Sequence, residues 1–203
     1  MEGGLRERKK QKTRDEISAA AMALFRERGF DAVTVAEVAR AADVSEKTVF
    51  NYFPAKEDLV AHRGAELTKA LIEAVREQPP GVSVIEPFRR MTEALLDAVE
   101  REPVESIVAV PRLVMGSQTL RERLVVGWED EAAALTPVIA ERAGLEPDDF
   151  LAAMTARMLS WTHRLIFRAA FTRLLAGDDQ VEVAAALRVE AARAYDKLER
   201  GFA

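Results

Sequence analysis

The chain has no cysteine, so disulfides, thiolate metal sites and cysteine nucleophiles are all excluded. Long apolar runs are missing too, because no segment approaches the roughly 18 uncharged apolar residues that a membrane span requires. The opening residues, Met1 to Gly4, are not followed by an apolar signal region. We therefore expect a protein of the reducing cytoplasm that makes no contact with membranes.

Catalytic motifs are equally scarce. The sequence has no Gly-rich phosphate loop after a strand and no nucleophile elbow. Its carboxylates are scattered along the chain, and neither of its 2 histidines completes the Glu-x-x-His spacing of helical di-metal sites. We expect neither an enzyme nor a bound cofactor or metal.

Helical periodicity is the main pattern that the sequence does contain. Hydrophobic residues make up 49% of the 203 residues, which is enough for a real core, and no strand pattern or internal repeat appears. We therefore predict an all-α fold. A Thr13–Glu16 capping box should start the first helix, which Gly29 ends. A later helix should begin near Lys56 and stop at Pro79, and the remaining ones should cover about 83–101, 104–115, 119–143, 148–176 and 180–199.

Residues 34–59 have the pattern of two short helices joined by a tight turn and followed by the start of a third. Thr34 and Glu37 form a capping box that starts the first helix, and Ser45 suits the N-cap of the second. On the second helix Val49 and Phe53 face inward, and the outward-facing set is Glu46, Lys47, Thr48, Asn51 and Tyr52. Such polar side chains contact phosphates and base edges when a helix enters a major groove.

This stretch resembles the helix-turn-helix of the tetracycline-repressor (TetR) family of transcription regulators. The family pattern runs from an aromatic pair through Phe-x-x-Lys into the next helix, as residues 50–59 do here. Turn, caps, aromatics and Lys56 are in register over about residues 10–62. Asp43 stands where the family usually has glycine, and aspartate adopts a left-handed turn only at some cost. Phe50 stands where tyrosine is common, so no phosphate contact from a hydroxyl is expected there.

The resemblance implies a homodimeric regulator, most often a repressor, that binds a palindromic double-stranded DNA operator and is released by a small-molecule effector. We accordingly predict a DNA-binding domain at 1–60 and a ligand-sensing and dimerisation domain at 61–203. An alternative, suggested by Asp43 and Phe50, is a helical small-molecule-binding or interaction module with a degenerate head. The predicted base-edge contacts are Lys47, Thr48 and Asn51. The predicted phosphate contacts are Thr34, Tyr52 and Lys56. Ser45 and Glu46 are also expected to face DNA, and the role of Glu46 is left open.

The net charge of −5 is unevenly distributed. Residues 1–60 carry 11 basic and 11 acidic side chains, so the whole excess of negative charge lies in 61–203. Basic residues cluster between Leu5 and Arg14, at Arg6, Arg8, Lys9, Lys10, Lys12 and Arg14. Next to a DNA-reading motif we interpret this cluster as an arm that contacts phosphates or the minor groove, the alternative being a solvated tail.

Two prolines lie inside predicted helices, Pro111 and Pro137. Each removes a backbone donor and tends to kink its helix, and kinks can open cavities. Adaptable or aromatic apolar side chains on the same segments suggest a pocket for a hydrophobic effector. The predicted ligand contacts are Phe88, Met91, Leu95, Met115, Trp128, Met154, Met158 and Trp161. Ordinary core packing is the alternative for each of them.

The segment 148–176 is apolar on more than one side, so we expect more than one side to be buried. One of these sides carries Leu151, Met154, Met158, Trp161 and Leu165. The next segment, 180–199, is rich in alanine, whose small side chain allows close helix approach. In proteins that resemble the TetR family the last two long helices form a four-helix dimer interface, and these segments fit that use. The alternative is that they complete a monomeric core.

The two histidines receive different predictions. His62 has Asp58 and Glu66 one helical turn away on either side, an arrangement that could bind a metal or raise proton affinity, but we favour a solvated helix face. His163 lies among apolar residues and should be buried and hydrogen-bonded, with a ligand or partner contact as the alternative.

Overall fold

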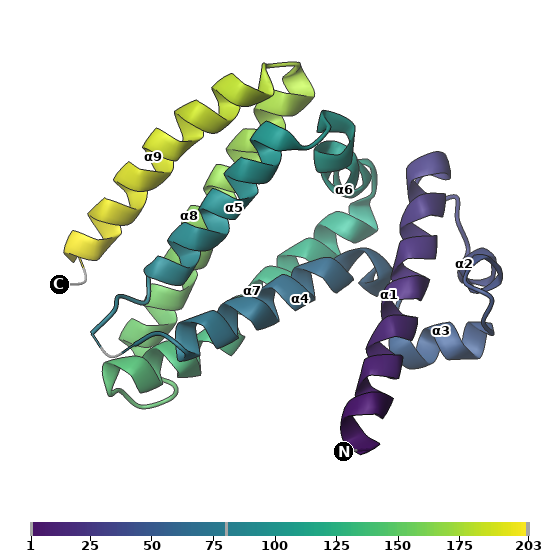
Figure 1. Cartoon of the computed structure of the whole chain (residues 1–203), viewed down its shortest axis with the longest axis horizontal. Coiled ribbons are helices and arrows are strands. Elements are labelled where there is room, and N and C mark those ends of the chain that lie inside the picture. Colours follow the sequence, from purple (N-terminus) through teal and green to yellow (C-terminus); the bar gives the residue numbers. More distant parts are fainter. Residues whose placement is uncertain (1, 80, 202–203) are drawn as a thin grey trace. The chain divides into compact units, whose positions relative to one another are not determined.

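The computed structural model describes residues 2–79 and 81–201, and side chains from residue 8 onward. Every regular element in these ranges is a helix, which confirms the predicted all-α fold (Figure 1). None of the described helices is long and apolar enough to span a membrane. The helices are α1 (Glu2–Arg28), α2 (Val35–Ala41), α3 (Glu46–Tyr52), α4 (Asp58–Arg76), α5 (Glu86–Arg101), α6 (Val104–Gly116), α7 (Gln118–Ala143), α8 (Phe150–Ala176) and α9 (Gln180–Gly201).

The start of α1 differs from the prediction. The helix does not begin at a capping box on Thr13 but runs from Glu2 through the basic cluster. The Thr13 hydroxyl donates to the carbonyl of Lys9, at 3.1 Å, which is how threonine bonds inside a helix rather than at its N-cap. The basic cluster is therefore the first part of a helix, and the side chain of Arg6 lies outside the described ones.

The chain divides into two compact units. The first, here called the head unit, comprises Met1–Gly64 and Ala109–Val125; the second, the body unit, comprises Ala65–Val108 and Val126–Ala203. Segment 109–125 joins the head unit because the side chain of Leu120 is buried in its core. The hydroxyl of Ser117 also donates to a carboxylate oxygen of Asp31, at 2.9 Å. The sequence-based domain limits did not anticipate this second segment.

Each unit has its own apolar core. The core of the head unit is built from α1, α2, α3 and the start of α4, with Ile17, Phe25, Val38, Val49 and Phe53 all nearly inaccessible to solvent. Val49 and Phe53 thus face inward, as predicted. In the body unit α5 packs against α8 and α9 (Figure 1). Pro111 lies within α6 and Pro137 within α7, as the sequence indicated.

Candidate functional site

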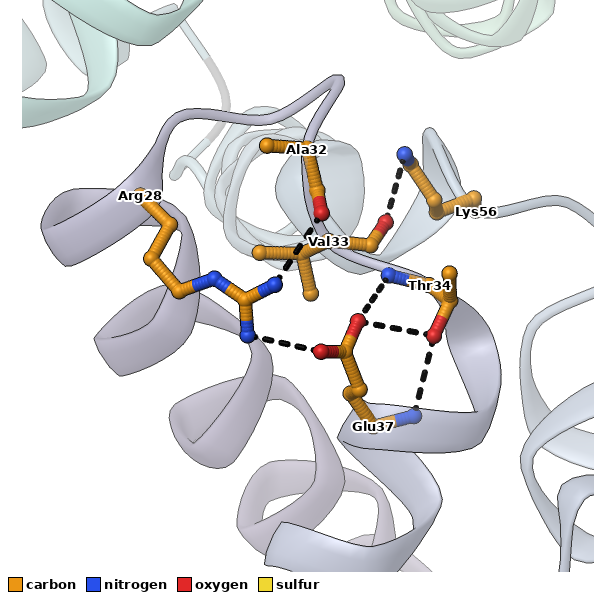
Figure 2. A network of polar contacts seen from close by, with 6 residues as sticks. All are labelled: Arg28, Ala32, Val33, Thr34, Glu37 and Lys56. Atoms are coloured by element: carbon orange, nitrogen blue, oxygen red, sulfur yellow. Dashed lines mark hydrogen bonds and ion pairs between the residues drawn. The ribbon is translucent and has the colours of Figure 1, made fainter.

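The first helix of the helix-turn-helix begins at a complete capping box, shown in Figure 2. The Thr34 hydroxyl accepts from the backbone N–H of Glu37 at 3.3 Å, and the backbone N–H of Thr34 donates to the Glu37 carboxylate at 2.8 Å. This backbone bond, followed by the Arg28 guanidinium and the Thr34 hydroxyl, lowers the pKa of Glu37 to about 2. The carboxylate therefore stays charged at neutral pH and holds the start of α2 in place.

Two cations fasten this box to its surroundings (Figure 2). Arg28, in the last turn of α1, contacts the Glu37 carboxylate at 2.7 Å and donates to the carbonyl of Ala32 at 3.2 Å. The ammonium of Lys56 donates to the carbonyls of Phe30 and Val33, each at 2.8 Å. The backbone between α1 and α2 is thus held from both sides, and sequence reasoning missed the part played by Arg28.

Lys56 has a structural role that differs from the predicted one. Besides its two carbonyl bonds, its ammonium lies 4.1 Å from the centroid of the Phe30 ring, a cation–π contact. An ammonium has three N–H donors, so two of them are already engaged inside the head unit. A phosphate contact by Lys56 stays a prediction, and only the third N–H donor of the ammonium is left to make it.

The turn between α2 and α3 has the strained residue that the sequence indicated. Asp43 has a positive φ of 52°, and among described residues it is the only one other than glycine to do so. The turn closes with a bond from the N–H of Val44 to the carbonyl of Ala39, at 2.9 Å. The departure from glycine therefore leaves the helix-turn-helix backbone intact.

Helix α3 begins at Ser45, as predicted. The Ser45 hydroxyl accepts from the backbone N–H of Thr48 at 3.0 Å, and the two hydroxyls lie 2.8 Å apart. Thr48 is consequently half-buried and engaged in the cap, which limits its hydroxyl for base contacts. Tyr52 is half-buried as well and packs against the head core. The residues of α3 that are exposed are Glu46, Lys47, Phe50 and Asn51.

The predicted DNA contacts therefore fall into two groups. Glu46, Lys47 and Asn51 lie on the exposed side of α3, together with Phe50, which was not among the predicted contacts. The hydroxyls of Thr34 and Ser45 are used as helix caps. The contacts of all of these residues with DNA stay predictions.

A polar chain crosses the core of the body unit. The hydroxyl of Thr92, on α5, lies 2.8 Å from both the Nδ1 atom of His163 on α8 and the hydroxyl of Tyr195 on α9. Burial lowers the pKa of His163 to about 4, with Glu131 opposing and Arg164 reinforcing the shift. Burial also raises the pKa of Tyr195 to about 12. Both groups are neutral at pH 7. His163 is hydrogen-bonded, as predicted, and is partly buried.

A second polar cluster joins α4, α7 and α8. Arg164 contacts the Glu131 carboxylate at 2.8 Å and also donates to the carbonyl of Trp128 at 3.2 Å. The Thr68 hydroxyl donates to the other oxygen of Glu131 at 3.2 Å. One hydroxyl nearby is different: Ser160, on α8, is buried and has no hydrogen-bond partner among the described residues. A buried polar group without a partner is uncommon and costly.

The eight predicted ligand contacts differ in their surroundings, and their contacts with an effector stay predictions. Phe88 is in the closed core, with Met91 and Leu95 packed against it. Met115 belongs to the head unit and is exposed. The rings of Trp128 and Trp161 meet edge to face, 5.7 Å apart.

The reason for this difference is the orientation of α8. Its buried sides pack on α5 and α9, which leaves the opposite stripe on the surface. Met154, Met158 and Trp161 lie on that stripe and are between a third and a half exposed. Helical spacing shows that residues share a side, but only the packing shows whether that side faces a core or solvent.

His62 is not on a solvated face, so that prediction is wrong. Only 7% of its surface is exposed, and its Nε2 atom lies 3.1 Å from a carboxylate oxygen of Asp15 on α1. The ring also meets Phe53 edge to face at 5.5 Å. Its supposed partner Asp58 instead bonds to Arg123, at 3.0 Å. His62 is thus a packing residue between α1 and α4 in the head unit.

Comparison with known proteins points to one family. A sequence model described as "Bacterial regulatory proteins, tetR family" matches residues 17–62, which include the last part of α1, all of α2 and α3, and the start of α4. The curated HTH-type transcriptional regulator TcmR of Streptomyces glaucescens is 28% identical over 151 residues, which are 72% of this chain and 67% of TcmR.

Solved structures share the fold. NalD, the secondary repressor of the MexAB-OprM multidrug efflux pump in Pseudomonas aeruginosa, has a TM-score of 0.54 at 18% identity, over 91% of this chain and 95% of that one. The SmeT–triclosan complex has a TM-score of 0.56 at 16% identity, over 90% of each chain. At these identities the likeness shows a common all-helical architecture.

The motif match, the relationship to TcmR and the common fold agree with the geometry of α2, the turn and α3. Residues 17–62 are thus a helix-turn-helix of the bacterial tetR family of regulatory proteins, and the chain as a whole is similar to regulators of that family.

Proposed function

We propose that this protein is a ligand-responsive repressor that binds a palindromic DNA operator as a homodimer in the cytoplasm and is released by a small hydrophobic effector. The observation that carries the proposal is the exposed side of α3. Glu46, Lys47 and Asn51 are presented there on a helix whose start is capped and whose other side is buried. A helix held in this way can enter a major groove without reorganising.

The base-reading roles follow from side-chain chemistry. A lysine suits the O6 and N7 acceptors of guanine, and an asparagine suits the N6 and N7 atoms of adenine. We assign these roles to Lys47 and Asn51. Glu46 can accept from the amino group of cytosine. The basic first part of α1 supplies cations for phosphates, which strengthen binding without reading sequence.

Dimerisation is proposed through α8 and α9. The exposed stripe of α8, made of Leu151, Met154, Met158, Trp161 and Leu165, is a contiguous apolar surface of the kind that marks interfaces. On α9 the exposed small residues Ala185 and Ala192 would permit close helix approach. A second copy of the same surface would cover both helices around a two-fold axis. The three stripe residues first expected in a pocket therefore fit the dimer contact better.

The effector is proposed to bind in the body unit, between the core side chains of Met91 and Leu95 and the polar groups of α8. The buried Ser160 hydroxyl lacks a partner, and His163 is neutral, so an apolar effector that carries an uncharged hydrogen-bonding group would suit both. SmeT, whose fold is similar, forms a complex with triclosan. Helix α4 contributes residues to both units and is our candidate for transmitting the change.

Selection from random duplexes tests the central proposal. The protein should enrich an inverted repeat whose half-sites lie about one helical turn apart, because a two-fold dimer presents two equivalent α3 helices. With about 6 to 10 phosphates neutralised, affinity should fall steeply as salt rises. If no sequence is enriched, the protein is the helical binding module with a degenerate head and not a regulator of an operator.

Two matched lysine variants separate base reading from general attraction. Lys47→Ala should lose about 1 to 3 kcal/mol of binding free energy and relax specificity at one position in each half-site. Lys197→Ala removes another exposed cation, from α9, and should leave operator affinity nearly unchanged. Equal losses in the two variants would contradict the assignment of Lys47.

The dimer contact is tested by placing a charge on it. Ala185→Glu or Leu165→Glu would bury an unpaired carboxylate in the proposed interface, so sedimentation should show monomers where the wild type sediments as a dimer. A wild-type protein that is already monomeric at micromolar concentration would overturn this part of the proposal.

A further inference from the structure

Phe50 is the large hydrophobic side chain of the helix-turn-helix that the fold leaves outside. Its surface is 48% exposed, and it is the only exposed large hydrophobic residue among residues 34–59. It is also absent from the set of partly buried residues that pack against the head core. The ring therefore lies outside the head core, with about half of its surface open to a partner.

The position of Phe50 on α3 is central. It lies one helical turn after Glu46 and Lys47 and next to Asn51, and all four are exposed. Residues three and four apart are neighbours on a helix surface, so the ring lies between the acidic and the basic side chain. If α3 enters a major groove, as the proposed function requires, Phe50 is carried in with the polar residues.

Among the base edges of the major groove, one group is an apolar partner for such a ring. A phenylalanine ring has no polar group with which to bond a phosphate or the donors and acceptors of base edges. The C5-methyl group of thymine is the apolar feature that the major groove displays, and phenylalanine is among the side chains that contact it. We propose that Phe50 is a specificity-determining residue that selects thymine at one position of each half-site by packing on its methyl group.

The proposal rests on the proposed operator binding and can be tested separately from it. Once an operator has been selected, each thymine of the half-site is replaced in turn by deoxyuridine, symmetrically in both half-sites. This exchange removes only the methyl group and keeps every hydrogen-bonding atom. Affinity is then measured for the wild type, Phe50→Ala and Phe50→Tyr at fixed salt.

At one thymine position the wild type should bind the uracil duplex about fourfold more weakly per half-site, and therefore about fifteenfold overall, which is what burial of one methyl group contributes. Phe50→Ala should be insensitive to the same exchange. Phe50→Tyr keeps the ring and should keep the sensitivity. Because Phe50 is exposed, all three proteins should unfold at closely similar temperatures.

Two results would overturn the proposal. One is a wild type for which no thymine-to-uracil exchange weakens binding. The other is a Phe50→Ala variant that loses affinity for thymine and uracil duplexes by the same factor, which would mean that the ring packs on the sugar–phosphate backbone. Both results leave operator binding itself intact, whereas a failure to select any operator would count against the proposed function.

Discussion

The head unit and the body unit are stabilised in different ways. In the head unit, α2 and α3 have 7 residues each and are fixed by caps whose partners lie three residues apart, such as Ser45 and Thr48. In the body unit, α8 and α9 have 27 and 22 residues and are joined by contacts between distant parts of the chain. Arg89 and Asp196, at 2.8 Å, are 107 residues apart. The short helices of the head unit thus have local caps in addition to their buried side chains, whereas bonds between distant residues join the long helices of the body unit.

The two units also differ in what they leave exposed. The helix-turn-helix has a single large apolar side chain outside, Phe50, among polar neighbours. Helix α8 of the body unit instead has a whole apolar stripe outside. The first pattern suits a wet, charged surface such as DNA, and the second suits another protein surface.

The largest loss of stability should come from a substitution on the buried side of α8. Leu159 is fully buried in the body core, so Leu159→Ala should lower the free energy of unfolding by about 2 to 5 kcal/mol, through lost burial and the cavity that remains. Urea unfolding measures the loss, which should not depend on protein concentration.

The matched control is Leu165→Ala on the exposed stripe of the same helix. Its effect should appear only through the dimer, and should therefore shrink as the protein is diluted. Equal losses at every concentration would mean that both sides of α8 are buried within one chain.

The next largest effect should be a loss of stability of the body unit as the pH is lowered. The folded body unit keeps His163 neutral down to a pKa of about 4, whereas the unfolded chain takes up the proton near pH 6.5. Stability should therefore fall by about 3 kcal/mol as pH drops from about 6.5 to about 4. His163→Gln should remove this slope.

The capping box of the head unit should respond at lower pH. The pKa of Glu37 is about 2 in the folded state and is near 4.5 when the chain is unfolded. The stability that its carboxylate contributes is present above pH 4.5 and is lost as pH falls toward 2. Unfolding measured between pH 7 and pH 4.5 should show the His163 slope without this contribution. A His163→Gln protein with an unchanged slope would contradict the assignment.

Lys56→Met should destabilise the head unit by about 2 kcal/mol, because it leaves the carbonyls of Phe30 and Val33 without their charged donor. Thermal unfolding measures the loss. Lys47→Met, which removes an exposed lysine from α3, should change stability by less than about 0.5 kcal/mol. Similar losses of stability from the two substitutions would show that the bonds of Lys56 to the two carbonyls do not stabilise the head unit.

The smallest effect should be at the start of α3. Ser45→Ala removes the acceptor for the backbone N–H of Thr48 and should cost about 1 kcal/mol. Ser45→Asp supplies another acceptor at the same place and should recover most of the loss. If Ser45→Ala melts at the wild-type temperature, then α3 is held by its buried side alone.

Sequence reasoning was most accurate where the interactions are local. The capping box of Thr34, the left-handed Asp43 and the N-cap at Ser45 were all predicted, since each depends on residues within four positions of one another. The ends of α4 to α9 were also predicted to within three residues. The start of α1 was missed because a threonine-glutamate pair inside a helix has the same spacing as a capping box.

The burial of single residues was predicted less well. His62 was expected on a solvated face because Asp58 and Glu66 share its side of α4, but Asp15 and Phe53 cover it in the head unit. The sequence likewise did not indicate that segment 109–125 belongs to the head unit, because nothing in the pattern around Leu120 shows which core this leucine enters. Such contacts come from residues tens of positions away.

The sequence by itself therefore determined the all-helical fold, the helix-turn-helix and the resemblance to the tetR family, because periodicity, caps and turn chemistry act over one or two helical turns. Only the tertiary structure decided that α8 turns Met154 and Trp161 outward, that Lys56 fastens the head, and that Phe50 stays exposed. The physical reason is that helical spacing fixes which residues share a side, while the packing of distant helices fixes what that side faces.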